Sequence, residues 1–241
     1  MTTYVLVHGA WHTGVELEPV AEAIRAAGHS VHCPTIAGNR AGDSRRIGLE
    51  AAIASITDYL AAHDLSEVVL LGHSYGGMVI TGVADRMPER IRRLVYWNAF
   101  VPNPGEALND MVPPHYVALF DQVAAASPDN AVMLPFPIWR EAFINDADPA
   151  LAQSAYDRLN PHPYATFTDP IALSKAPAEM EIPKSYLNCT EDTALPQSLG
   201  WHPRLSEKLG LFRLVQIPGS HELCFTDPAA LAAGIIRAGR D

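Results

Sequence analysis

Residues 70–77, Leu-Leu-Gly-His-Ser-Tyr-Gly-Gly, place a serine between two glycines in the order Gly-x-Ser-x-Gly. An apolar run precedes the motif, and a helical pattern from Met78 to Arg86 follows it. Gly72 and Gly76 leave room for a sharp turn from strand to helix, which lifts the serine above the end of a sheet. The turn also places the serine at a helix N-terminus, where amide N–H groups face developing negative charge. The sequence therefore predicts that Ser74 is a nucleophile for acyl transfer.

A serine hydroxyl is a poor nucleophile unless a base takes its proton. In enzymes with this strand–serine–helix turn, the acid follows a later strand and the histidine follows the last strand. Only His221, of the ten histidines, fits this order, because it comes just after an expected last strand at residues 212–217. We expect its imidazole to reach over the end of the sheet toward Ser74.

Two neighbouring carboxylates, Glu191 and Asp192, follow the strand expected at residues 184–189. Because side chains adjacent in sequence cannot both point at one imidazole, one of the two must be a bystander. We choose Asp192, since the residue further past the strand end is better placed to turn back over the sheet. Its carboxylate would accept a hydrogen bond from the ring N–H remote from the serine and stabilise the imidazolium. Glu191, the alternative acid, is expected to face solvent.

Acyl transfer also needs hydrogen-bond donors for the oxyanion, which backbone amides supply. We expect one donor to be the N–H of Tyr75, directly after the serine, and the other to be the N–H of Ala10 in the loop after the first strand. Gly9 allows this loop to approach the site closely. We assign Gly9, Trp11 and Trp139 to substrate binding, with the two tryptophans lining an apolar pocket.

Short apolar runs alternate with helical patterns along the chain, which predicts a mostly parallel sheet with right-handed crossovers, flanked by helices, in the α/β class. Asp227-Pro228 is typical of a helix start, with the aspartate as N-cap. The expected strands are Tyr4–Val7, Ser30–Cys33, Glu67–Leu71, Arg93–Asn98, Lys184–Cys189 and Phe212–Ile217.

Residues 103–182 depart from this alternation of strands and helices, because prolines and aromatic residues are concentrated there between short helical stretches such as Ala150–Leu159. A connection this long between two core strands indicates an inserted cap or lid rather than a structureless loop. The alternative is a second packing layer with no role toward a ligand. We therefore divide the chain into an α/β core, residues 1–102 and 183–241, and a cap, residues 103–182.

The charge balance limits the expected partners and location. The 27 Asp and Glu residues exceed the 17 Lys and Arg residues and give a net charge of -10, which excludes nucleic acid and an anionic membrane surface. No apolar stretch is as long as a membrane span, and the N-terminus passes into a strand without the basic region of a signal peptide, so we expect a cytoplasmic protein. The expected partner is a small-molecule ester. The sequence leaves open whether the chain forms a homodimer.

The histidines and cysteines do not form a pattern typical of a metal site. Three cysteines are odd in number and far apart, which argues against a disulfide framework or a zinc site. His8 and His12 lie four residues apart, but in a glycine-containing loop rather than on a helix. We expect no metal, no cofactor, and a structural role for His12.

These segments together resemble the α/β-hydrolase superfamily and, within it, the branch of small plant methylesterases, plant hydroxynitrile lyases of this fold and their bacterial esterase relatives. The resemblance covers nearly the whole chain, and it implies the α/β-hydrolase fold and supports Asp192 over Glu191 as the triad acid. The segments that carry it are His8-Gly9-Ala10-Trp11, Gly72-His-Ser-Tyr-Gly-Gly, Cys189-Thr-Glu-Asp-Thr-Ala-Leu-Pro with Trp201 downstream, Gly219-Ser-His221, and the cap stretch at residues 159–170.

We therefore expect a serine hydrolase that cleaves a small carboxylic ester through an acyl-enzyme. Two alternatives stay open: a hydroxynitrile lyase, and a ligand-binding protein on the same fold. The plant lyases that the chain resembles carry a threonine in the oxyanion loop and a lysine directly after the catalytic histidine. Here those positions are Gly9 and Glu222, which favours ester hydrolysis. A carboxylate beside the leaving group would repel a departing cyanide. The alternative is that the Glu222 side chain points to solvent.

Overall fold

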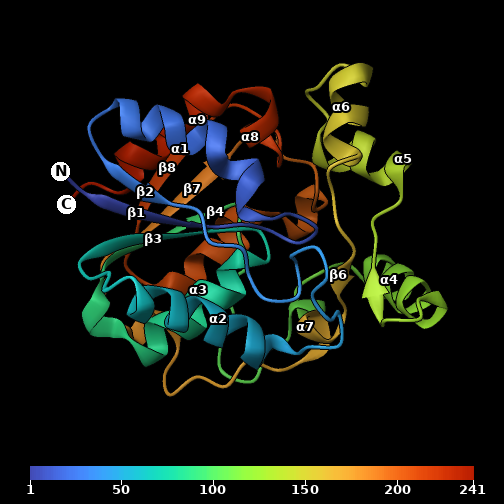
Figure 1. Ribbon diagram of the computed structural model, residues 1–241, viewed down its shortest axis with the longest axis horizontal. Coiled ribbons are helices and arrows are strands. Elements are labelled where there is room, and N and C mark those ends of the chain that lie inside the picture. Colours follow the sequence, from blue (N-terminus) through green and yellow to red (C-terminus); the bar gives the residue numbers. More distant parts are fainter.

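The computed structural model describes all 241 residues and is built around a six-stranded parallel sheet with strand order β2-β1-β3-β4-β7-β8 (Figure 1). All six predicted strands are present, with ends that differ from the prediction by at most two residues, so the predicted fold class is confirmed. Their bounds are β1 Thr3–Val7, β2 Ser30–His32, β3 Val68–His73, β4 Ile91–Trp97, β7 Lys184–Cys189 and β8 Arg213–Ile217.

Helices cover both faces of the sheet (Figure 1). Helices α1 (Glu18–Ala26) and α9 (Pro228–Ala238) pack on one face, and α2 (Leu49–Ala62) and α3 (Gly76–Arg86) pack on the other. Every residue of β3 is buried, and its side chains alternate between the two hydrophobic clusters on either side. This explains why the central strands read as continuous apolar runs rather than as alternating patterns.

Several short elements complete the chain, and one of them confirms a predicted helix start. The Asp227 side chain accepts a hydrogen bond from the Ala230 N–H at 2.9 Å and so caps α9. No helix has both the length and the apolar character needed to cross a membrane. The short helical segments outside residues 103–182 are Gly14–Leu17, Pro88–Arg90, Gln197–Leu199, Trp201–Leu205, Ser206–Leu209 and α8, Leu223–Thr226.

The insertion between β4 and β7 folds into short helices and a small antiparallel sheet beyond the end of the main sheet that lies opposite the chain termini (Figure 1). Its apolar side chains belong to the same hydrophobic cluster as α2 and α3, so it packs as a continuation of the core. Its role as a substrate cover stays a prediction. The elements are Leu108–Asp110, α4 Pro114–Ala126, β5 Ala131–Val132, α5 Phe136–Ile138, Trp139–Phe143, α6 Pro149–Tyr156, β6 His162–Pro163, α7 Ala165–Thr168 and Pro177–Glu179.

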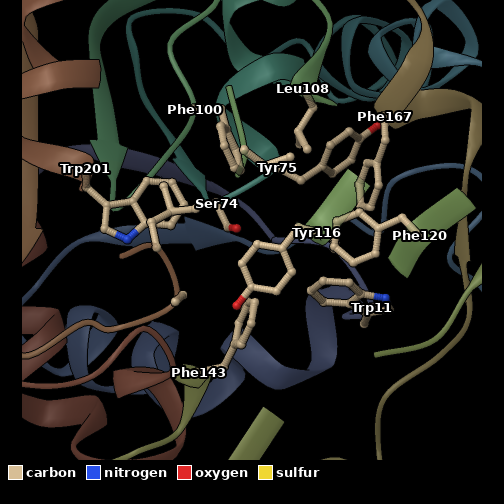
Figure 2. Close-up of a pocket in the computed structure, with 14 residues that line it drawn as sticks. Trp11, Ser74, Tyr75, Phe100, Leu108, Tyr116, Phe120, Phe143, Phe167 and Trp201 are labelled. Carbon is tan, nitrogen blue, oxygen red and sulfur yellow. The ribbon is translucent and has the colours of Figure 1, made fainter. Parts of the chain in front are cut away.

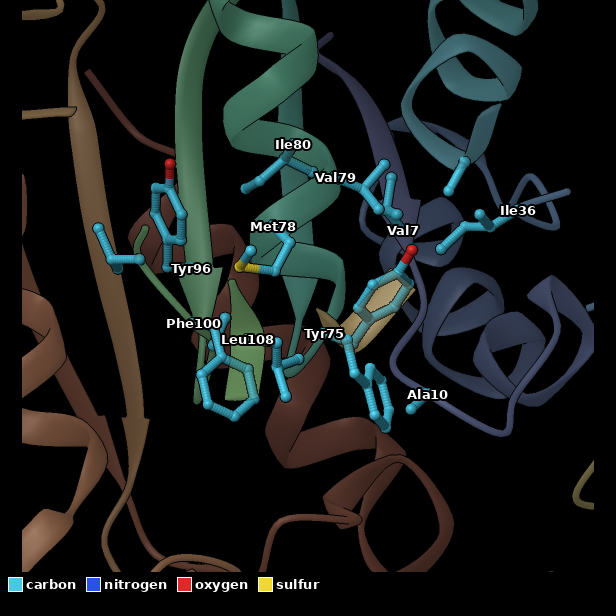
Figure 3. Close-up of a cluster of buried hydrophobic side chains, with 14 of the residues drawn as sticks. Val7, Ala10, Ile36, Tyr75, Met78, Val79, Ile80, Tyr96, Phe100 and Leu108 are labelled. Atoms are coloured by element: carbon cyan, nitrogen blue, oxygen red, sulfur yellow. The ribbon is translucent and has the colours of Figure 1, made fainter. Parts of the chain in front are cut away.

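Figure 3 shows how α3 is anchored in this cluster, with Met78, Val79 and Ile80 packed among apolar side chains from the first strand and from the segment after β4. All three side chains are fully buried. Since α3 starts immediately after the predicted nucleophile, this packing fixes the helix end that lies beside Ser74.

The turn between β3 and α3 consists of only two residues, Ser74 and Tyr75. It depends on glycine at both flanks: a Cβ on Gly72 would lie 2.5 Å from the carbonyl oxygen of Gly76, and a Cβ on Gly76 would lie 2.8 Å from the carbonyl oxygens of Val7 and His8. These contacts are with backbone atoms, which cannot rotate away as a flexible side chain can. The spacing of the motif is thus a steric requirement of the fold.

We predict that Gly72→Ala lowers the free energy of unfolding by about 1–3 kcal/mol or more, because the added methyl group forces the backbone of the turn apart. Urea denaturation followed by circular dichroism measures the change. Gly200→Ala is the matched control, since that glycine has φ of -60° and its added Cβ would meet no atom closer than 3.4 Å. Equal stability of the two variants would contradict the steric account.

Candidate active site

Ser74 adopts a left-handed backbone conformation, with φ of 53°, that is uncommon for a residue with a side chain. Three hydrogen bonds hold it there: its N–H donates to the carbonyl of Trp97 at 3.2 Å, and its carbonyl accepts from Gly77 and Phe100 at 3.0 and 3.1 Å. Figure 2 shows the Ser74 hydroxyl directed into a space enclosed by aromatic side chains. Strain of this kind is typical of functional positions.

His221 and Asp192 form a buried pair at the ends of the last two core strands. The Nδ1 atom of His221 lies 2.6 Å from Oδ2 of Asp192, and the two side chains are 1% and 0% exposed. The second carboxylate oxygen accepts the Ala194 N–H at 2.8 Å. Glu191 is exposed, and only its backbone is hydrogen-bonded. Of the two candidate acids, the structure therefore pairs Asp192 with His221.

The imidazole of His221 is held between two aromatic rings. Trp201 stacks on it with a centroid distance of 5.0 Å and an interplanar angle of 16°, and Phe143 meets it edge-on at 5.3 Å and 88°. Trp201 and Phe143 line one cavity together with Ser74 (Figure 2). The Ser74 hydroxyl makes no hydrogen bond to another protein group. Catalytic hydrogen bonds of this type often form only when substrate is bound.

Asn98 is a residue of this site that the sequence reasoning missed. It follows β4 with a positive φ of 35°. Its side-chain amide donates to Asp192 and to the carbonyl of Cys189, and its side-chain carbonyl accepts the Cys189 N–H at 2.6 Å. Asn98 thus fixes the orientation of the acid across two neighbouring strands. The one signal in the sequence was its position as the last residue of the expected strand Arg93–Asn98.

The two predicted oxyanion donors lie at the cavity wall. Ala10 and Tyr75 are both buried and both line the cavity, and neither backbone N–H donates to a protein acceptor. Gly9 brings the loop close to the nucleophile, because a Cβ on Gly9 would lie 3.2 Å from the Cβ of Ser74. Buried backbone donors are rarely unpaired, so this pair is suited to an oxygen of a bound molecule.

The cavity is lined almost entirely by apolar side chains, and Ser74 is the one residue of its lining that is not hydrophobic. Trp11 lines it as predicted. Trp139 lies outside this lining: its side chain is fully buried, and its indole N–H donates to the carbonyl of Ala152 at 3.2 Å. The lining residues are Ala10, Trp11, Ser74, Tyr75, Phe100, Leu108, Val112, Tyr116, Phe120, Phe143, Phe167, Ala194, Leu195 and Trp201.

Glu222 points neither to solvent nor into the cavity. Its side chain is 1% exposed, and its Oε2 lies 3.1 Å from Nε2 of His12. Nitrogen and oxygen atoms of His73, His221 and Glu222 come within 4.8 Å of one another, but each residue already has a protein partner: the carbonyl of His221, Asp192 and His12, respectively. Burying a carboxylate without a partner is energetically unfavourable, and here His12 is the partner.

The sequence matches the Alpha/beta hydrolase family over residues 4–234. The chain belongs to this family. It is 35% identical to a carbendazim hydrolyzing esterase from Nocardioides sp. (strain SG-4G), over 99% of this chain and 100% of that protein. It is 26% identical to a pyrethroid hydrolase from Sphingobium wenxiniae, over 98% of this chain and 86% of that protein.

The fold of this alpha/beta hydrolase matches that of an extracellular alpha/beta-hydrolase from a Paenibacillus species with a TM-score of 0.97, at 39% identity and full coverage of both chains. Plant methylesterases and an alpha-hydroxynitrile lyase from Arabidopsis thaliana match parts of the chain, which confirms the branch inferred from the motifs. The cytoplasmic location stays a prediction.

We predict that Asp192→Asn lowers kcat of this hydrolase by about 10⁴-fold, because the amide no longer selects the productive histidine tautomer. Glu191→Gln should leave kcat within about twofold of wild type, since the Glu191 side chain is exposed and takes no part in the pair. Steady-state kinetics with p-nitrophenyl acetate measures both. If the two variants exchange these outcomes, the assignment of the acid is wrong.

Proposed function

We propose that the chain is a serine esterase that cleaves small carboxylic esters through an acyl-enzyme. The observation that carries the proposal is the buried Asp192–His221 pair beside a cavity that contains Ser74 and the two unpaired amides of Ala10 and Tyr75. A strained serine, a histidine oriented by an acid, and free backbone donors are the parts that acyl transfer requires.

The reaction would proceed in two halves that use the same groups. Ser74 Oγ attacks the ester carbonyl carbon while His221 takes the hydroxyl proton, and the N–H groups of Ala10 and Tyr75 stabilise the oxyanion. Collapse of this intermediate breaks the ester bond, and the imidazolium returns the proton to the departing alcohol. Water then attacks the acyl-enzyme with His221 again as base, which releases the acid and restores Ser74.

The walls of the cavity favour substrates with an apolar acyl or alcohol group. We propose that residues 103–182 act as its cap, since six of the lining side chains come from this segment: Leu108, Val112, Tyr116, Phe120, Phe143 and Phe167. The names of two relatives describe hydrolysis of carbendazim and of pyrethroids, and the first is called an esterase. These names support hydrolysis of an ester without defining the substrate of this chain.

We predict a burst of p-nitrophenol when the protein is mixed with an excess of p-nitrophenyl acetate, with an amplitude near one equivalent per chain, because acylation of Ser74 precedes slower deacylation. Ser74→Ala should abolish the burst and lower turnover by at least about 10⁴-fold. Its melting temperature controls for folding. A wild-type chain that binds apolar esters but shows neither burst nor turnover would favour the ligand-binding alternative.

The lyase alternative rests on the partial match to the alpha-hydroxynitrile lyase, which is 33% identical over 111 residues. The structure changes the physical argument against it. Glu222 does not repel the leaving group from the cavity, because it is buried and paired with His12. Two other features argue against the lyase alternative. His12 is already paired with this carboxylate, and Gly9 has no hydroxyl at the position of the lyase threonine.

We predict that the chain releases no cyanide from mandelonitrile above the rate of a Ser74→Ala control, because no free cation is available to stabilise the leaving anion. A colorimetric cyanide assay at pH 5–6, where spontaneous decomposition is slow, makes the comparison. Ser74-dependent cyanide release would establish the lyase activity instead.

A further inference from the structure

The loop after β1 contains two buried histidines whose rings hold consecutive backbone carbonyls. His8 Nδ1 lies 2.8 Å from the carbonyl oxygen of Gly9, and His12 Nδ1 lies 2.6 Å from the carbonyl oxygen of Ala10. Since a carbonyl can only accept, both Nδ1 atoms must carry a proton. The histidines thus hold two consecutive peptide groups: the Gly9–Ala10 group, which contains the proposed oxyanion donor Ala10 N–H, and the Ala10–Trp11 group that follows it.

The second ring nitrogen distinguishes the two histidines. Nε2 of His8 accepts the Ile36 N–H at 3.0 Å, so His8 is a neutral imidazole with both nitrogens satisfied. Nε2 of His12 instead faces Oε2 of Glu222 at 3.1 Å. With Glu222 ionised, this contact is attractive only if Nε2 also carries a proton. The surroundings of His12 then require an imidazolium, whereas those of His8 require a neutral ring.

The other titratable groups around His12 are consistent with this assignment. Burial lowers the pKa of His8 to about 4 and that of His73 well below its usual range, so neither ring adds charge near pH 7. Burial also raises the pKa of the Cys224 thiol, which keeps it neutral. Glu16 pairs with Arg158 at 3.4 Å. His12 and Glu222 are then the remaining cation and anion. The titratable groups around His12 are Glu222, Glu16, His8, His73, Cys224, Arg158, His162 and His221.

Burial by itself lowers the pKa of His12, but the Glu222 and Glu16 carboxylates and the Ala10 carbonyl outweigh it, so the pKa is raised above its usual value. The raised pKa of His12 sets the direction in which the ion pair depends on pH. The ion pair is complete at and below the usual histidine pKa, and it is lost as the pH rises through the raised value. Above that pH, the bare Nε2 and the Glu222 carboxylate are two acceptors at close distance and repel each other.

Glu222 directly follows the proposed catalytic base, and His12 lies two residues after the proposed oxyanion donor. Trp11, which lies between Ala10 and His12, has φ of 66°, so the backbone of this loop is strained. We infer that the His12–Glu222 ion pair is the positioning element of the active site: it clamps the oxyanion loop to the His221 turn and so fixes the Ala10 N–H relative to Ser74. This inference rests on the proposed esterase function for its kinetic consequence, but not for the charge state of His12.

The charge state is tested by NMR on the full chain labelled with ¹⁵N-histidine. We expect the His12 ring, assigned by its loss in a His12→Phe/Glu222→Met variant, to remain an imidazolium at pH 7.5. In Glu222→Gln it should be neutral, because the amide can donate to Nε2 and burial then dominates. A neutral His12 in the wild-type protein at pH 7.5 would overturn the inference whether or not the chain hydrolyses esters.

The positioning role is tested by kinetics with p-nitrophenyl acetate. Replacing both charges with apolar side chains in His12→Phe/Glu222→Met should preserve folding, with a melting temperature within about 5 °C of wild type, because buried ion pairs are often replaceable by apolar groups. It should lower kcat by about 10- to 100-fold with KM changed less than about threefold, since the loop that carries the Ala10 N–H is released. Unchanged kcat in the folded double variant would overturn the positioning role.

The pH profile separates positioning from a general structural effect. Wild type should lose kcat at alkaline pH as His12 gives up its proton. Glu222→Gln should lower kcat at pH 7 by less than the double variant does and should lack this alkaline loss, because the amide donates to neutral His12 without repulsion. Glu50→Gln is the matched control and should follow wild type, since it removes a 2.6 Å pair with Arg86 at the end of α3 that is remote from Ser74. Identical alkaline profiles for wild type and Glu222→Gln would contradict the inference.

Failure of the proposed function gives a different result. If Ser74→Ala does not reduce ester turnover, the esterase proposal fails, while the NMR result still decides the charge state of His12. If turnover depends on Ser74 but the double variant is fully active, the esterase proposal stands and the positioning role is lost.

Discussion

The active-site region depends on one steric constraint, the two-residue turn that joins β3 to α3. Backbone atoms of Gly76 approach Gly72 so closely that no side chain fits between them, and Ser74 is held in a left-handed conformation by hydrogen bonds to the ends of neighbouring segments. The parallel sheet makes this possible, because the carboxyl ends of β3, β4 and β7 meet at one edge. Every other proposed catalytic group is placed relative to this turn.

Around the turn, the molecule combines an apolar cavity with several buried ionisable groups. Desolvation makes a buried charge costly unless it is paired, and the structure pairs each one: Asp192 with His221 and Asn98, and Glu222 with His12. Neighbouring histidines that lack a carboxylate partner, such as His8 and His73, are kept neutral by burial. Charge is therefore confined to defined positions beside a wall of aromatic rings.

The insertion, residues 103–182, contributes six of the fourteen residues that line the cavity without forming a core of its own. Its apolar side chains continue the cluster that covers one face of the sheet, and Trp11 ties it to the oxyanion loop through a hydrogen bond to the carbonyl of Val132 at 3.0 Å. A change in the packing of the insertion would therefore shift the loop that carries the proposed oxyanion donor. The size of the cavity and the position of that loop are thus linked through packing.

The sequence by itself determined the features that follow from local pattern: the six strands, the helix cap at Asp227, and the strand–serine–helix turn at Ser74. These depend on side-chain periodicity and on the need for glycine at close approaches, which act over a few residues. The order of the chain was enough to nominate His221. It also narrowed the acid to two adjacent carboxylates, which local reasoning alone could not rank firmly.

Only the tertiary structure decided which side chains meet across the sheet. Asn98 and Asp192 come together because β4 and β7 are neighbours, although they lie 94 positions apart in the chain. Glu222 lies neither in solvent nor in the cavity, and Trp139 lies outside the cavity lining. The partner of each, His12 for one and the carbonyl of Ala152 for the other, belongs to a segment whose position only packing defines. A residue type and its place in the sequence describe what a side chain can do, whereas the fold determines what it faces.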